Sequence, residues 1–94
     1  MMKVMKEVIR EVMPWCDQQV LIFHTSENEE VTLPVLMGTV YDLPTDSWHI
    51  TLHARPEGKR QYSQALVRWI VPASEPWSVE ELKQAITTRL QAAG

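Results

Sequence analysis

The sequence predicts a mostly β domain of the α+β class, in which five short strands close into a small bent barrel with a helix at each end. An amphipathic pattern with helical spacing covers residues 2–13, and the apolar period changes to two over the barrel segment, residues 18–72. A second helical pattern covers residues 78–92. Ninety-four residues are enough for only one hydrophobic core, so we expect a single domain over residues 1–94.

The N-terminal helix, residues 2–13, is expected to be amphipathic. Pro14 restricts the backbone of the residue before it, so the helix is predicted to end at Met13. Its polar face carries charges of both signs, which favours docking on the protein's own core or on a neighbouring subunit over binding to a membrane surface. The apolar face consists of Val4, Met5, Val8, Ile9, Val12 and Met13.

The barrel is predicted from extended segments at residues 18–24, 30–43, 47–54 and 61–71. Pro34 and Gly38 interrupt the second segment, and these residue types mark edge positions, bends or bulges in strands. The last segment is long for one strand, so we interpret it as two strands, 61–66 and 67–71, joined by a tight turn. Closure into a barrel would remove the two open edges of so short a sheet, and a strand bent at glycine forms a barrel corner.

The C-terminal helix, residues 78–92, has the clearest signals. Ser78 and Glu81 match an S-x-x-E capping box, and Trp77 is placed to pack on Leu82 one turn into the helix. The apolar stripe consists of Val79, Leu82, Ile86 and Leu90.

Several of these segments together resemble a known family. The leading helix, the glycine-containing second strand and the terminal run Y-S-Q-A-L-V-R-W-I-V-P resemble the Sm-like barrels, especially the bacterial Hfq branch. The run D-S-W-H-I at residues 46–50 resembles the entry into the third strand of that branch. The resemblance covers about residues 2–72 and implies an Sm-like or SH3-like barrel that assembles into a homo-oligomeric ring, with RNA as a ligand.

The resemblance also implies a set of RNA-binding residues. It places Trp48 where an aromatic residue stacks on a base, and it places Ser63 and Gln64 where the family has basic side chains. With a net charge of −3 as well, we expect at best weak binding to short U- or A-rich RNA that falls steeply with salt. The implied RNA-binding set is Ser47, Trp48, Arg55, Lys59, Arg60 and Gln64.

Other residue patterns give little reason to expect an enzyme, a metal site or a cofactor. On one strand, His49 and His53 would lie about 13 Å apart at ~3.3 Å per residue, so a shared metal ion would need His24 or a carboxylate from a neighbouring strand. Cys16 is expected to be buried and unreactive, because the adjacent Asp17 disfavours the thiolate. No catalytic or metal-binding residue is therefore predicted.

We predict a non-enzymatic, oligomeric binding module in the cytoplasm. The single cysteine fits a reducing compartment, and the longest apolar run is too short to span a bilayer, so no membrane partner is expected. Four tryptophans and exposed strand ends favour several copies over a monomer. The alternatives are an SH3-like adaptor or inhibitor that binds a protein partner, and a small enzyme whose site the sequence does not reveal.

Overall fold

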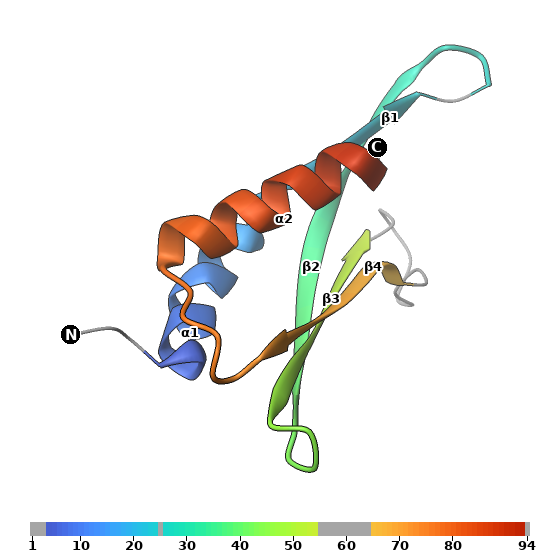
Figure 1. Ribbon diagram of the computed structural model, residues 1–94. Helices are drawn as coiled ribbons and strands as arrows, with labels where there is room; N and C mark the ends of the chain where they lie inside the picture. The colour runs from blue at the N-terminus through green and yellow to red at the C-terminus, as the bar shows by residue number, and fades with distance from the viewer. Residues whose placement is uncertain (1–3, 25, 55–64, 94) are drawn as a thin grey trace.

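The computed structural model describes residues 4–24, 26–54 and 65–93. The strands pair antiparallel in the order β1-β2-β3-β4, and both helices lie on one side of this sheet (Figure 1). The molecule is elongated, with extents of 48 × 25 × 20 Å. Its elements are α1 (Met5–Cys16), β1 (Val20–His24), β2 (Glu30–Asp42), β3 (Ser47–Ala54), β4 (Ala65–Pro72) and α2 (Val79–Ala93).

The predicted five-stranded closed barrel is wrong, because the sheet is open. β2, β3 and β4 form a three-stranded antiparallel sheet, and β1 extends it by pairing only with the first part of β2. β1 and β4 stand at opposite ends of the strand order, and the described residues contain no ladder between them. The two helices cover the apolar face that a second barrel wall would have covered.

The interruptions in β2 have roles other than turning a barrel corner. Pro34 is the last β2 residue opposite β1, and Val35 is the first opposite β3, so proline stands where the partner changes. The β2–β3 register runs without a shift through Gly38, which therefore marks no bulge. A Cβ at Gly38 would lie 2.7 Å from Oγ1 of Thr51, so the glycine allows a close cross-strand approach.

β4 is one strand over Ala65–Pro72 rather than two strands joined by a tight turn after residue 66. The irregularity at this place is a bulge: Leu52 pairs with Val67 and His53 pairs with Ala65. One extra β4 residue is thereby accommodated within a continuous strand. Residues 61–64 of the predicted segment lie outside the described residues.

The N-terminal helix begins and ends later than predicted. Val4 has an extended backbone and precedes the first helical residue, Met5, and the helix passes through Pro14 to Cys16. The residues after the proline contribute to packing, since Cys16 is fully buried and Trp15 contacts the core. Burial of these side chains offsets the loss of one helical hydrogen bond at proline.

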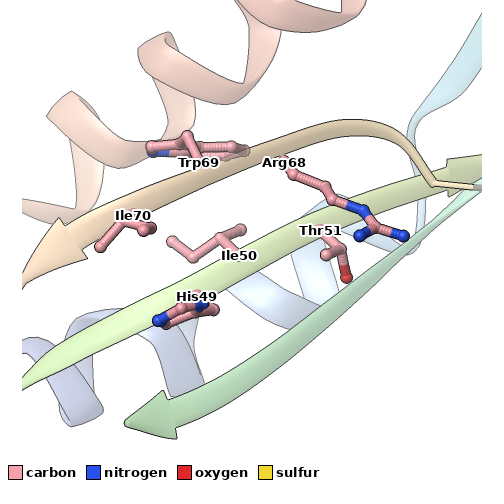
Figure 2. A pocket seen from close by; sticks show the side chains of 6 residues that line it. All are labelled: His49, Ile50, Thr51, Arg68, Trp69 and Ile70. Carbon is pink, nitrogen blue, oxygen red and sulfur yellow. The ribbon is translucent and has the colours of Figure 1, made fainter. Parts of the chain in front are cut away.

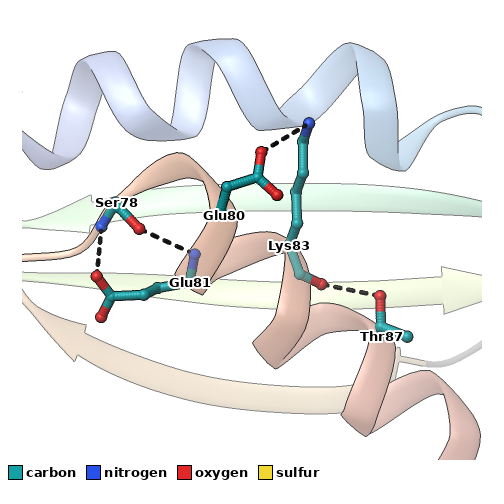
Figure 3. Close-up of polar contacts among 5 residues, drawn as sticks. All are labelled: Ser78, Glu80, Glu81, Lys83 and Thr87. Atoms are coloured by element: carbon teal, nitrogen blue, oxygen red, sulfur yellow. Dashed lines mark hydrogen bonds and ion pairs between the residues drawn. The ribbon is translucent and has the colours of Figure 1, made fainter.

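The C-terminal helix confirms the predicted capping box (Figure 3). The backbone N–H of Glu81 donates to Oγ of Ser78 at 3.0 Å, and the N–H of Ser78 donates to Oε1 of Glu81 at 3.3 Å. An ion pair between Lys83 and Glu80, 3.7 Å long, lies on the same turn. The cap fixes where α2 starts and hence where its apolar stripe meets the sheet.

The core fills the space between the two helices and one face of the sheet, which we call the inner face. From the sheet it takes Val35, Met37, Ile50, Leu52 and Val71. These side chains alternate along their strands and match across them, since Met37 stands opposite Leu52 and Val35 opposite Ala54. From the helices come Met5, Val8, Ile9, Val12, Cys16, Leu82, Ile86 and Leu90.

Candidate functional site

The predicted RNA-binding set is not assembled within the described structure. Ser47 and Trp48 are adjacent in β3, so their side chains point to opposite faces of the sheet. They cannot contact the same ligand on one face. The other predicted members, Arg55, Lys59, Arg60 and Gln64, lie outside the described residues.

Ser47 is the first residue of β3 and is buried, with 4% of its surface exposed, beside the turn that joins β2 to β3. Its Oγ lies 2.7 Å from Oγ1 of Thr45, and Thr45 in turn hydrogen-bonds to the carboxylate of Asp42. Asp46 in this turn has a positive φ of 48° and accepts a hydrogen bond from the Tyr41 hydroxyl. Ser47 therefore stabilises the turn and is not available to a ligand.

Trp48 lies at the end of the inner face, where helix cover is incomplete. Its ring centroid is 5.2 Å from that of Tyr41, with the rings tilted by 50°. The hydrogen bond to Asp46 raises the pKa of Tyr41 above its usual value. A shallow depression between α1 and the sheet is lined by Lys6, Ile9, Arg10, Met13, Pro14, Asp17, Thr39 and Trp48.

The opposite side of the sheet, which we call the outer face, carries the side chains that alternate with those of the core. Neither helix covers it in the described part of the chain (Figure 1). Directly paired residues share a face, so the register assigns its members. The outer face comprises Val20, Ile22, Thr32, Pro34, Leu36, Gly38, Val40, His49, Thr51, His53, Arg68 and Ile70.

Branched aliphatic side chains are exposed on this face. Val40 and Ile70 are 66% and 59% exposed, and they stand on either side of His49 in the central strand. Val20 and Ile22 on β1 are about half exposed, at 50% and 48%. Val40 and Ile70 thus form one exposed aliphatic group around His49, and Val20 and Ile22 form a second one on β1. Exposed aliphatic groups of this kind mark interaction surfaces.

A short polar network crosses the outer face between β2 and β3. The hydroxyl of Thr51 donates to the carbonyl oxygen of Gly38 at 3.3 Å, and Nε2 of His53 lies 3.2 Å from the same hydroxyl. Either atom of this second contact can be the donor, depending on the tautomer of His53. These contacts hold the Thr51 side chain over Gly38, which has no side chain of its own.

The surface between β3 and β4 is slightly hollowed here. In Figure 2, Arg68 extends across Thr51, whereas Trp69 points away toward α2. The depression has a volume of about 490 Å³ and is shallow and open. Its lining residues are His49, Ile50, Thr51, Arg68, Trp69 and Ile70.

The tryptophans do not form the exposed interface that their number suggested. Trp15, Trp48, Trp69 and Trp77 are all partly buried and pack against the core cluster. Two of them also lie beneath cationic side chains: Lys83 is 5.6 Å from the Trp15 ring centroid and Arg89 is 4.3 Å from that of Trp69. Trp69 and Trp77 therefore extend the core rather than a surface for a partner.

The buried cysteine was predicted correctly. Cys16 is a free thiol that is fully buried in the core. Burial, together with the nearby charge of Asp17, raises the pKa of Cys16 to about 11. At neutral pH the group is therefore a protonated thiol, which is a poor nucleophile. Among the described residues, no group of three or more histidine, cysteine or acidic side chains is arranged to bind a metal ion.

One sequence pattern indicated an apolar outer face, but the barrel prediction interpreted the same residues as part of a bent strand. Residues 33–37 read L-P-V-L-M, an unbroken apolar run, whereas a strand with one solvated face alternates apolar and polar residues. Such a run indicates apolar side chains on both faces of the strand. The approach of Lys6 and Arg10 to Trp48 has no comparable signal, because it depends on how α1 packs against the sheet.

No helix in the described ranges is both long and apolar enough to cross a membrane. Comparison of the chain with protein-family models, with curated proteins and with solved structures finds no match.

Proposed function

We propose that this protein is a non-enzymatic protein-interaction module that self-associates by packing its outer face against the outer face of a second copy. The contrast between the two faces of the sheet carries the proposal. Both helices cover the inner face, while Val40 and Ile70 remain more than half exposed on the outer one. Burial of these side chains would contribute roughly 25 cal/mol for each Å² of apolar surface removed from water.

The register supports a symmetric partner. Val40, His49 and Ile70 form one row across β2, β3 and β4. A two-fold axis along β3 would place β2 of one copy over β4 of the other, so Val40 would meet Ile70 at two equivalent positions. Both contacts are apolar, and His49 lies between them at the centre.

The next row places a polar group beside this apolar contact. Here Gly38 lies on β2, Thr51 on β3 and Arg68 on β4. The same axis places Arg68 of one copy over Gly38 of the other, where the Thr51 hydroxyl already lies over the glycine. The apolar contact of Val40 with Ile70, made twice, is therefore what favours a second copy.

The proposed interface would use most of the outer face. A stable interface buries about 800 Å² on each partner. The molecule measures 48 × 25 Å along its two longer axes, and the outer face includes the β1–β2 hairpin as well as the three-stranded sheet. Stacked sheets of this kind lie about 10 Å apart with their side chains interdigitated.

The test is the mass of the protein in solution at micromolar concentrations. A dimer of two 10.9 kDa chains, 21.8 kDa, is expected by light scattering. Val40→Glu and Ile70→Glu should each shift the protein toward the monomer, because each places a charge in the interface. Leu43→Glu is the matched control: Leu43 is 76% exposed but lies in the turn after β2, outside the outer face.

A monomeric wild-type protein would overturn the proposal. A dimer that tolerates both glutamate substitutions would show that a different surface associates. Larger assemblies that also tolerate them would favour pairing of strand edges, as a ring requires, over contact between faces.

RNA binding and a cytoplasmic location stay predictions and are not needed for this proposal. Four members of the predicted RNA-binding set lie outside the described residues, and Ser47 is buried at the start of β3. Titration of short U- and A-rich RNA at low and physiological salt tests the RNA prediction, and the weak binding expected should vanish at the higher salt.

A further inference from the structure

We propose that the depression between α1 and the inner face, beside Trp48, binds a nucleoside monophosphate. This site lies on the opposite side of the sheet from the proposed self-association surface. The inference is therefore independent of the oligomeric state.

The apolar wall of the depression is suited to a flat ring. Ile9, Met13, Pro14 and Trp48 provide it, and Trp48 is the aromatic member. The ring of Tyr41, its cross-strand neighbour, lies beside Trp48 with the ring centroids 5.2 Å apart. Stacking on an aromatic side chain is a sequence-independent way to hold a nucleobase, because each base has a π-face.

The polar part of the depression is suited to a phosphate. Lys6 and Arg10 are one helical turn apart on α1, so they project on the same side of the helix. Within the described residues neither has an ion-pair partner, so both are available to a ligand. A lysine and an arginine together match the two negative charges of a phosphate monoester.

The local charge favours an anion although the whole chain is acidic. The net charge is −3, but the lining contains two cationic residues and one acidic residue, Asp17. Asp17 follows the last turn of α1, seven positions after Arg10. Glu7 and Glu11 are the nearest acidic residues in sequence to Lys6 and Arg10, and neither lines the depression.

The size limits the ligand to about one nucleotide. The depression has a volume of about 340 Å³, at the lower end of the range of about 300–1,000 Å³ for small-molecule sites. Thr39 also lines the depression and adds a hydroxyl group to it. A nucleotide with its base on Trp48 and its phosphate at Lys6 and Arg10 would contact both the apolar and the cationic residues. A base alone or a phosphate alone would contact only one of these two groups.

Calorimetric titration with four probes tests this arrangement: adenosine 5′-monophosphate, uridine 5′-monophosphate, adenosine and ribose 5-phosphate. The monophosphates should bind at least about tenfold more tightly than adenosine or ribose 5-phosphate, because only they fill both parts of the site. Lys6→Ala and Arg10→Ala should each weaken monophosphate binding about tenfold, the usual effect of losing one charge-assisted contact.

Arg68→Ala is the matched control, since it removes one positive charge from the outer face and should leave binding unchanged. Trp48→Leu should abolish the advantage of adenosine monophosphate over ribose 5-phosphate, with circular dichroism used to check that the variant is folded. Ile70→Glu should retain full binding, which separates this site from self-association.

No binding of either monophosphate at millimolar concentration would overturn the proposal. Equal losses in Arg10→Ala and Arg68→Ala would also overturn it, because they would indicate attraction by overall charge rather than by this site. Unchanged affinity in Lys6→Ala and Arg10→Ala would place any nucleotide elsewhere on the molecule.

Discussion

The two faces of the sheet differ in what covers them, although they are built from the same strands. On β3, Ile50 and Leu52 are completely buried, while the alternating residues His49 and Thr51 are only partly buried. On β2, Met37 is buried and Val40 is largely exposed. An apolar side chain on this sheet therefore belongs to the core only if it points to the inner face, and the alternation along each strand determines to which face it points.

This difference separates stability from association. The inner face holds the helices to the sheet, so its residues determine the free energy of unfolding. Branched aliphatic residues on the outer face contribute little to the isolated chain and are available to a partner. Substitutions that are similar in chemistry should consequently have different effects on the two faces.

The largest difference is expected between Leu52→Ala and Val40→Ala. Leu52 is fully buried, so its truncation should lower the free energy of unfolding by about 2–5 kcal/mol. Val40→Ala should change it by less than about 0.5 kcal/mol, as is usual for an exposed site. Urea unfolding measures both, at a concentration low enough to keep the chain monomeric. Comparable losses would mean that the outer face is covered in the monomer.

Cys16 allows a pH test of burial in the core. Its pKa is raised to about 11 in the folded chain from 9.0, so the unfolded chain loses this proton first as the pH rises. Stability should be unaffected below pH 9 and fall between pH 9 and 11, by about 2–3 kcal/mol in total for this group. The raised pKa of Tyr41 acts in the same direction at higher pH.

Unfolding measured across this range in the wild type and in Cys16→Ala isolates the cysteine contribution. The variant should lose less stability than the wild type. Iodoacetamide at pH 8 should leave the folded wild type unmodified and should label it in urea. Rapid labelling without urea would show that the thiol is accessible.

Gly38 is the outer-face position at which stability should depend on the side chain. A Cβ would lie 2.7 Å from Oγ1 of Thr51, which is held by hydrogen bonds to Gly38 and His53. Gly38→Val should lower the free energy of unfolding by about 1–3 kcal/mol through this crowding. Gly38→Ala should cost less, and adding Thr51→Ala should recover part of that loss. An additive double mutant would mean that Thr51 is not the obstacle.

The smallest effect is expected at the cap of α2, the helix that covers the inner face. Ser78→Ala removes the oxygen that accepts the Glu81 N–H, which should cost about 1 kcal/mol. Ser74→Ala, in the preceding loop, is the matched control and should be neutral. A neutral Ser78→Ala would show that packing against the sheet, rather than the cap, fixes the start of α2.

Prediction from sequence succeeded where the deciding interactions are local. The apolar spacing of residues 78–92 and the Ser78–Glu81 capping box identified α2, and α2 occupies Val79–Ala93. The third strand, predicted at residues 47–54, is β3 at Ser47–Ala54. The prediction that α1 would end at Met13 failed because burial of Cys16 extends the helix beyond Pro14.

The candidate site was harder to predict. The sequence singled out Trp48, but the resemblance grouped it with Ser47, which points to the other face and is buried at the start of β3. The residues that the structure places near Trp48 are Lys6 and Arg10, more than thirty positions earlier in the chain. Proximity of this kind depends on the packing angle of α1, which local spacing does not encode.

The sequence by itself determined that a helix stands at each end of an extended region, and it placed the third strand, because periodicity and capping act within a few residues. Only the tertiary structure decided whether the sheet closes. An apolar sheet face can be covered by a second barrel wall or by helices, and the two solutions use similar local patterns. Here α1 and α2 pack against each other and on the inner face, so the sheet stays open and its outer face remains exposed.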